Sequence, residues 1–572
     1  MVISRSRFIA LWILIVCSSL ASFAASPRPA WAKYAMVSSA ERMATDVGVR
    51  VLQRGGNAVD AATAVALTLN VTEMYSSGIG GGCFILIRMA DGTAIAIDGR
   101  ETAPALASRL MYVPQDTTVV SEASTVGVLA AGTPGELAAL DLAVKQYGKL
   151  SLGEILEDVI ALADTGFMVS MRTARALDRE RDKLKLFEGT REIFFKDDSV
   201  TLAFGDRLVQ TDLAHTFRHI QVYVTDEFYR GDIARTVGEY VQVKGGVLSA
   251  EDFAAYQPVA RDPVMGEYRG CRILSMPPPS SGGIHLIQIL NLLEPFDLKS
   301  MGLGSSESVH VIAEAMQIAF ADRAEYLGDP AFSTVPTTGL VSKEYADLRR
   351  NKIHLRKHRH LDQPGNPFAF GPDPTDNPDG KHTTHLCVVD SFGNAVSLTA
   401  TINTPFGSGV IVPGTGFFLN NEMDDFVTWP GHPNFFGLVG KAANEIERGK
   451  RPLSSMSPAI LVKDDEPFML IGSMGGPRII TSTVLTIINS IDFGMQLQAA
   501  MDFPRFHQQW VPDQLFLEPE YSNDVIAALT RKGHLIKIQD PWAAVTAILA
   551  DSTYGGWRGA ADSRVDGAAK GF

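Results

Sequence analysis

The chain has 572 residues, of which 46% are hydrophobic and 20% are charged, and its formal net charge is −13. The composition is typical of a globular protein and the length allows a large buried core, whereas the negative charge argues against nucleic acid as a partner. Beyond the N-terminal segment the cysteines are Cys83, Cys271 and Cys387. Their wide spacing excludes a disulfide framework or a metal knuckle, so we expect three buried, unpaired thiols.

The N-terminus has the pattern of an export signal. Two arginines precede an apolar run at residues 8–16, and small residues follow at Ser22 and Ala24 and again at Ala30 and Ala32. The run is too short to span a membrane comfortably. We therefore expect residues 1–32 to hold a signal peptide that is cleaved near 24 or near 32. The mature protein is expected in the periplasm or outside the cell, without a membrane anchor.

Residues 38–70 predict two consecutive helices. The first runs through 40–54, with Ser38 and Ser39 as N-cap candidates, and a pair of glycines ends it. The second follows Asn57, whose side chain is suited to capping a helix.

A glycine-rich bend at residues 78–82 leads into a predicted strand at 84–88, and an Asp-Gly turn at 91–92 returns a second strand at 93–98. The bend lacks the Lys-Ser/Thr pair of a phosphate loop and precedes a strand, so we do not expect nucleotide binding.

The middle of the chain is predicted to be mostly helical from 135 to 260. A Pro-Ser-Gly loop at 277–283 then precedes an apolar helix at 284–293. The segment 352–360 contains three histidines among lysines and arginines, with no acidic residue or cysteine beside them. Because neighbouring cations repel a metal ion, we interpret it as a solvated basic helix end. We expect neither a metal nor a cofactor.

A change in composition marks residue 383. Residues 361–382 are rich in Pro, Gly and Asp and predict an irregular linker, whereas 384–401 alternate as a β-hairpin around a turn at 391–393. That register places Thr401 opposite Thr383. A threonine that follows a cleavable linker can become a new N-terminus, and its own α-amine can then act as the general base.

The C-terminal third contains four further polar motifs in turn contexts. They are Thr401-Ile402-Asn403, residues 420–426 (NNEMDDF), residues 451–458 (RPLSSMSP) and the Gly475-Gly476 loop, which follows a predicted strand and precedes a helix at 479–491. Consecutive glycines there could expose backbone N–H groups as an oxyanion hole.

Together with the Thr383-Thr384-His385 segment, these motifs resemble the γ-glutamyltranspeptidases. Further matching segments are DGRETAP at 98–104, PPPSSGG at 277–283, ADR at 321–323 and PRFH at 504–507. The resemblance implies an N-terminal-nucleophile hydrolase with a four-layer αββα sandwich (α+β). It also implies autocleavage between His382 and Thr383, which would give a large subunit, residues 33–382, and a small subunit, residues 383–572, interleaved in one fold.

The resemblance also implies the roles of the site residues. Thr383 would be the nucleophile and Thr401 would support it, while Gly475 and Gly476 would form the oxyanion hole. The donor's α-carboxylate would bind Arg100, Ser454 and Ser455, and its α-ammonium would bind Asn403, Glu422 and Asp425. The expected substrates are glutathione and other γ-glutamyl compounds, with water, amino acids or dipeptides as acceptors.

Three positions depart from the family pattern. Lys381-His382 precede the expected nucleophile, and Met474 stands in the expected oxyanion loop. Residues 429–437 resemble the active-site lid of bacterial members, with Phe436 at a position where a tyrosine is often found. Two alternatives remain. A cephalosporin or glutaryl acylase of the same fold would lack the ammonium-binding acids, and a secreted binding protein would never cleave itself.

Overall fold

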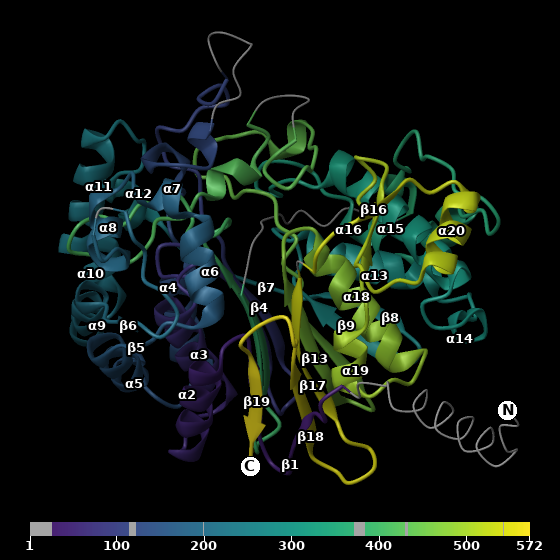
Figure 1. Ribbon diagram of the computed structural model, residues 1–572, viewed down its shortest axis with the longest axis horizontal. Coiled ribbons are helices and arrows are strands. Elements are labelled where there is room, and N and C mark those ends of the chain that lie inside the picture. The colour runs from purple at the N-terminus through teal and green to yellow at the C-terminus, as the bar shows by residue number, and fades with distance from the viewer. Residues whose placement is uncertain (1–25, 114–121, 198, 371–383, 429–432, 542) are drawn as a thin grey trace, which may run out of the picture.

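Two seven-stranded antiparallel sheets lie against each other at the centre of the molecule, and helices cover the outer face of each (Figure 1). The computed structural model describes residues 26–113, 122–197, 199–370, 384–428, 433–541 and 543–572. The layers therefore follow the order αββα, as the sequence predicts.

The first sheet has the order β1-β18-β17-β13-β12-β9-β8 and the second has the order β19-β2-β10-β11-β3-β4-β7. The strands of the first sheet are β1 (Ala30–Ala32), β8 (Val264–Tyr268), β9 (Cys271–Ser275), β12 (Ala459–Lys463), β13 (Glu466–Met474), β17 (Ala544–Ala550) and β18 (Trp557–Ala561). Those of the second are β2 (Met36–Ser39), β3 (Gly82–Arg88), β4 (Ala94–Gly99), β7 (Val259–Arg261), β10 (Thr384–Val389), β11 (Ala395–Thr401) and β19 (Ala568–Gly571).

The strands are apolar on both faces because both faces of each sheet are covered. Along β3, Phe84 and Leu86 point into the core between the sheets, whereas Ile85 and Ile87 pack under the helices of the second sheet. Cys387 lies in the core between the sheets, as expected. Cys83, Cys271 and Cys387 are all buried and free, so this prediction is confirmed.

Two groups of helices form the outer layers. Helices α2, α3 and α4 pack on the second sheet, and α13 and α18 pack on the first. The bounds of the first group and its neighbours are α2 (Arg42–Gln53), α3 (Ala58–Thr72), α4 (Glu136–Tyr147), α5 (Leu152–Thr165), α6 (Met171–Arg179), α7 (Arg181–Leu184), α8 (Glu188–Phe194), α9 (Thr211–Tyr223), α10 (Thr225–Arg230), α11 (Asp232–Val243) and α12 (Ala250–Ala255). Those of the second are α13 (Ser281–Leu293), α14 (Leu298–Met301), α15 (Ser306–Tyr326), α16 (Thr337–Leu340), α17 (Lys343–Arg350), α18 (Arg478–Ile491), α19 (Leu497–Asp502) and α20 (Asn523–Lys532).

Strands from the two sides of residue 383 are mixed in both sheets. In the second sheet, β10 and β11 lie between β2 and β3, which come from the N-terminal part of the chain. In the first sheet, β12 pairs with β9 of the N-terminal part. The hydrogen-bonded ladders therefore join both halves of the chain.

The start of α2 differs from the prediction. Ser38 and Ser39 belong to β2, where they pair with β10 and β19, so they are not N-caps. The cap is Glu41, whose carboxylate accepts a hydrogen bond from Ala44 N at 3.1 Å. Asn57 caps α3 as predicted, in a reciprocal capping box with Asp60.

The interpretation of residues 352–360 as a solvated basic helix end is correct for the lysines and arginines, which are exposed, but wrong for the helix and for His358. Helix α17 ends at Arg350, and these residues form irregular chain beyond it. The His358 side chain is only 8% exposed and lies between the carboxylates of Glu314 and Asp513. Both acids are distant in the sequence, so the local pattern could not reveal them.

Only part of the predicted signal peptide, residues 1–32, lies within the described residues. The apolar run and the site near 24 lie outside them, whereas Ala30–Ala32 forms β1, an edge strand paired with β18. Among the helices that the structure describes, none combines the length and the apolar character needed to cross a membrane.

Candidate active site

The predicted hairpin is present with the predicted register. β10 and β11 pair as Thr384 with Ala400 and Leu386 with Leu398. Thr383 lies outside the described residues, so its side chain is not placed, but it is bonded directly to Thr384 at the start of β10. Thr384 is fully buried, and its hydroxyl donates to Glu73 Oε2 at 2.9 Å.

Thr401 and Asn403 meet at the end of β11. The Asn403 backbone N–H donates to Thr401 Oγ1 at 2.8 Å, and Asn403 itself adopts a φ of 74°. The side-chain amide of Asn403 donates to the carbonyl of Asn421 at 2.8 Å. Its Oδ1 is buried and has no hydrogen-bond partner. This oxygen is therefore a fixed acceptor available to a ligand.

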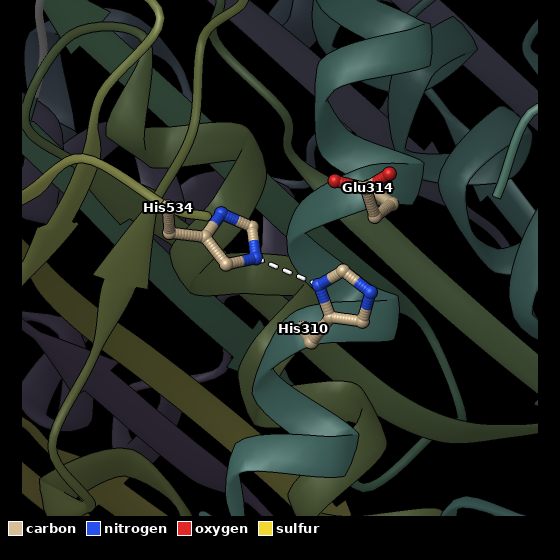
Figure 2. Close-up of side chains that lie close together, drawn as sticks. All are labelled: His310, Glu314 and His534. Atoms are coloured by element: carbon tan, nitrogen blue, oxygen red, sulfur yellow. Dashed lines mark hydrogen bonds between the residues drawn. The ribbon is translucent and has the colours of Figure 1, made fainter. Parts of the chain in front are cut away.

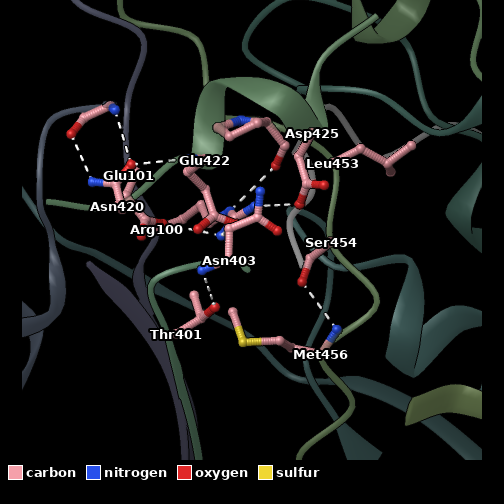
Figure 3. A network of polar contacts seen from close by, with 12 residues as sticks. Arg100, Glu101, Thr401, Asn403, Asn420, Glu422, Asp425, Leu453, Ser454 and Met456 are labelled. Carbon is pink, nitrogen blue, oxygen red and sulfur yellow. Dashed lines mark hydrogen bonds and ion pairs between the residues drawn. The ribbon is translucent and has the colours of Figure 1, made fainter. Parts of the chain in front are cut away.

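A second cluster centres on Arg100, which directly follows β4 (Figure 3). Its Nη1 lies 2.5 Å from Glu422 Oε1 and 3.0 Å from Glu101 Oε2, and its Nη2 lies 3.0 Å from Asp425 Oδ2. All four side chains are fully buried. The sequence predicted three of these residues for the site, and the structure brings those three together.

Three carboxylates surround one guanidinium, so ionisation of all three would leave an excess of negative charge. Burial raises the pKa of Glu422 well above its usual range, although Arg100 opposes the shift. Burial likewise raises the pKa of Glu101 to about 7. An additional cation would relieve this excess, because a buried carboxylate without a matching charge is costly.

Glu101 and Asn420 are members of the site that sequence reasoning did not assign. Glu101 is adjacent to Arg100 in the DGRETAP motif, which was the available signal. Asn420 Oδ1 accepts from Glu422 N at 3.0 Å and from Gly132 N at 2.9 Å, and it thereby holds the acidic turn in place.

The serine pair lies on the loop before β12. Ser454 Oγ accepts from Met456 N at 2.9 Å, and the loop is tied to Ser281, whose N–H donates to the Ser454 carbonyl at 3.1 Å. Ser455 Oγ is buried and has no hydrogen-bond partner. It is thus a second polar atom available to a ligand.

Gly475 and Gly476 connect β13 to α18. Their φ angles are 119° and 65°, in the region that favours glycine, so a side chain at either position would strain the loop. Met474 ends β13, and its sulfur lies 3.6 Å from Arg172 Nη2. Arg172 also contacts Glu73 at 2.5 Å, which links this loop to the carboxylate that binds Thr384.

The predicted lid is described only in part, because residues 429–432 lie outside the described residues. Asn434 Nδ2 donates to Asp425 Oδ1 at 3.2 Å, and Phe435 N donates to Asp424 Oδ2 at 3.0 Å. Phe436 packs its ring against Phe435, with the centroids 4.8 Å apart. Asn434, which the sequence did not single out, therefore provides a polar tether between this segment and the site.

The family model described as Gamma-glutamyltranspeptidase matches residues 44–572. The chain is 43% identical over 539 residues to a glutathione hydrolase proenzyme of Escherichia coli (strain K12), covering 94% of this chain and 91% of the relative. It is 35% identical over 555 residues to the acylase ACY 1 proenzyme of Pseudomonas sp. (strain SE83), covering 96% and 95%. The crystal structure of a cephalosporin acylase from Bacillus halodurans superimposes with a TM-score of 0.84 at 28% identity, covering 96% and 98%.

Proposed function

The chain belongs to the γ-glutamyltranspeptidase family, and from that premise we propose how its residues carry out γ-glutamyl transfer and hydrolysis. It is a self-processing γ-glutamyl acyltransferase and glutathione hydrolase with the N-terminal-nucleophile fold. The observation that carries the proposal is the buried cluster of Arg100, Glu422 and Asp425. A γ-glutamyl donor has a carboxylate and an ammonium on one carbon, and this cluster offers both opposite charges side by side.

In the proposed donor complex, Glu422 and Asp425 turn toward the α-ammonium, and the unpartnered Asn403 Oδ1 accepts one of its hydrogens. Arg100 releases part of its contact with these acids and binds the α-carboxylate, to which Ser455 Oγ also donates. The raised pKa of Glu422 supports this exchange, because the ammonium of the donor would stabilise the ionised carboxylate.

The proposed chemistry begins at Thr383. Its free α-amine, with an ordinary pKa of about 7.7–8.0, takes the proton of its hydroxyl, and Oγ attacks the γ-carbonyl of the donor. Thr401 supports the hydroxyl, and the backbone N–H groups of Gly475 and Gly476 stabilise the oxyanion. The leaving amine takes the proton and departs. Water, an amino acid or a dipeptide then attacks the γ-glutamyl ester and regenerates Thr383.

We propose that the precursor is cleaved between His382 and Thr383, giving a large subunit that ends at residue 382 and a small subunit of 383–572. The mixed strand order of both sheets supports this division, because hydrogen-bonded ladders would hold the two pieces together after cleavage. Removal of the signal peptide would accompany export to the periplasm or the medium. The pairing of Ala30–Ala32 with β18 favours a cleavage site before residue 30.

The acylase alternative rests on the ACY 1 relative and on the superposition with the cephalosporin acylase. A glutaryl side chain has no α-ammonium, so it would leave Glu422 and Asp425 without a partner. Both acids are present and converge on Arg100. The γ-glutamyl donor therefore suits this site better.

A comparison of two anilides tests the proposal. The purified, matured protein is assayed with a γ-glutamyl anilide and with the matching glutaryl anilide, each with and without a dipeptide acceptor. We expect the γ-glutamyl substrate to react about 10²-fold faster or more in kcat/KM, because the glutaryl substrate leaves buried acids unpaired. Equal values for the two substrates would promote the acylase alternative.

A further inference from the structure

One ligand atom from each of His310, Glu314 and His534 lies within 4.8 Å of the other two, and Figure 2 shows these three side chains close together. We propose that these side chains bind a zinc ion. Zinc takes imidazole nitrogen at about 2.0–2.1 Å and carboxylate oxygen at about 2.0–2.2 Å, so two ligands of a tetrahedral site lie about 3.4 Å apart. The three atoms need to move by only on the order of 1 Å to reach that geometry.

The fold brings the three ligands together from distant parts of the chain. His310 and Glu314 are four residues apart on α15 and therefore share one face of the helix. His534 follows the end of α20. Their exposed fractions are 0%, 3% and 3%, so the donors converge in the interior, where an ion would be shielded from water.

The orientation of His310 matches that of a metal ligand. Its Nε2 lies 2.7 Å from the backbone carbonyl oxygen of His354, so this nitrogen carries the hydrogen and donates it. Nδ1 therefore keeps its lone pair and accepts the hydrogen of His534 Nε2, 2.7 Å away. When zinc binds, His534 Nε2 releases this hydrogen to solvent and its Nδ1, which has no hydrogen-bond partner in the structure, takes up a proton, so both histidines are neutral ligands. Metal-binding histidines commonly donate their second nitrogen to a carbonyl or a carboxylate, which fixes the tautomer.

His358 can supply the fourth ligand. Its Nδ1 lies 2.6 Å from Glu314 Oε1, its Nε2 lies 3.2 Å from Asp513 Oδ2, and its ring stacks on His534 with the centroids 4.5 Å apart. When zinc binds, the Nδ1 hydrogen leaves as a proton to solvent and Nδ1 turns to the ion, while Asp513 still holds Nε2–H. The charges of Glu314 and Asp513 then balance the charge of Zn²⁺.

The site would join segments on both sides of residue 383. His310, Glu314 and His358 precede it, and Asp513 and His534 follow it. If the chain is cleaved as proposed above, the ion would connect the large subunit to the small one. Zinc binding itself does not depend on cleavage or on catalytic activity, so the two proposals fail separately.

The test uses the purified full-length protein, stripped with a chelator and then desalted. Titration with zinc and elemental analysis should give one tightly held ion per chain and a higher Tm. Cobalt(II) in place of zinc should give the visible absorption bands of a tetrahedral site. His534→Ala and Glu314→Gln should lose the ion, and Asp513→Asn should weaken binding about 10- to 100-fold.

His354→Ala is the matched control. His310 contacts only the backbone carbonyl of His354, which alanine retains, so zinc binding should persist. If wild-type protein neither binds zinc nor shows the cobalt bands, the proposal is overturned, whatever the variants show. Retention of the ion by both ligand variants at the wild-type level would overturn the assignment of these ligands.

Discussion

Replacing Asp425 by asparagine should weaken the γ-glutamyl donor selectively. Asp425 Oδ2 lies 3.0 Å from Arg100 Nη2, and Asp425 Oδ1 accepts from Asn434 Nδ2 at 3.2 Å. Asn keeps the size of the side chain but loses the charge that would pair with the donor's ammonium. A hydrogen bond to a charged group contributes about 1.5–3 kcal/mol, which corresponds to about 10- to 150-fold in kcat/KM.

The assay compares kcat/KM of wild type and variant for a γ-glutamyl anilide and for the matching glutaryl anilide, with maturation followed on a denaturing gel. The glutaryl substrate should lose little, because it has no ammonium for Asp425 to bind. Asp424→Asn is the control, since that neighbouring carboxylate accepts from Ser124 Oγ at 2.8 Å and from Phe435 N at 3.0 Å. Equal losses for both substrates, or an unchanged γ-glutamyl rate, would refute the role assigned to Asp425.

Three further variants test other parts of the structure. Arg100→Lys should mature normally but raise KM for γ-glutamyl donors about 10-fold or more, because a point charge cannot reproduce the two-pronged contact; unchanged kinetics would place the carboxylate elsewhere. Burial raises the pKa of Glu41 from 4.5 to about 7, so the folded state keeps a proton that the unfolded state loses, and stability falls as pH rises through that range. In Glu41→Gln the Tm should therefore decrease less between about pH 5 and pH 8 than it does in wild type. The same dependence of Tm on pH in both proteins would contradict this role of Glu41. Gly472→Ala would put a Cβ 2.3 Å from the His385 ring and should lower stability by about 1–3 kcal/mol, whereas Gly78→Ala, with no atom nearer than 3.8 Å, should cost less in the same thermal melt.

Local sequence patterns were sufficient to predict the β10–β11 hairpin and the start of α3. The alternation of β-rich residues around a tight turn predicted β10, β11 and their register, and Asn57 correctly marked the start of α3. The cap of α2 was missed because Ser38 and Ser39 are held in β2 by pairing with distant strands, and local propensity does not show such pairing.

The buried cluster around Arg100 was predictable only through the family motifs. No spacing rule connects Arg100 with Glu422 and Asp425, which meet because β4 and the turn that contains both acids approach each other in the folded chain. The pairing of His358 with Glu314 and Asp513 could not be predicted for the same reason. Contacts between residues far apart in the sequence become visible only in three dimensions.

The most direct test of the central claim is the N-terminus of the small subunit. Wild-type protein and Thr383→Ala are purified in parallel, separated on a denaturing gel and subjected to N-terminal sequencing. We predict that wild type gives two chains, the smaller of which begins at Thr383, and that Thr383→Ala gives one uncut, folded and inactive chain. Two chains in Thr383→Ala, or a smaller wild-type chain that begins at another residue, would contradict the assignment of Thr383 as nucleophile.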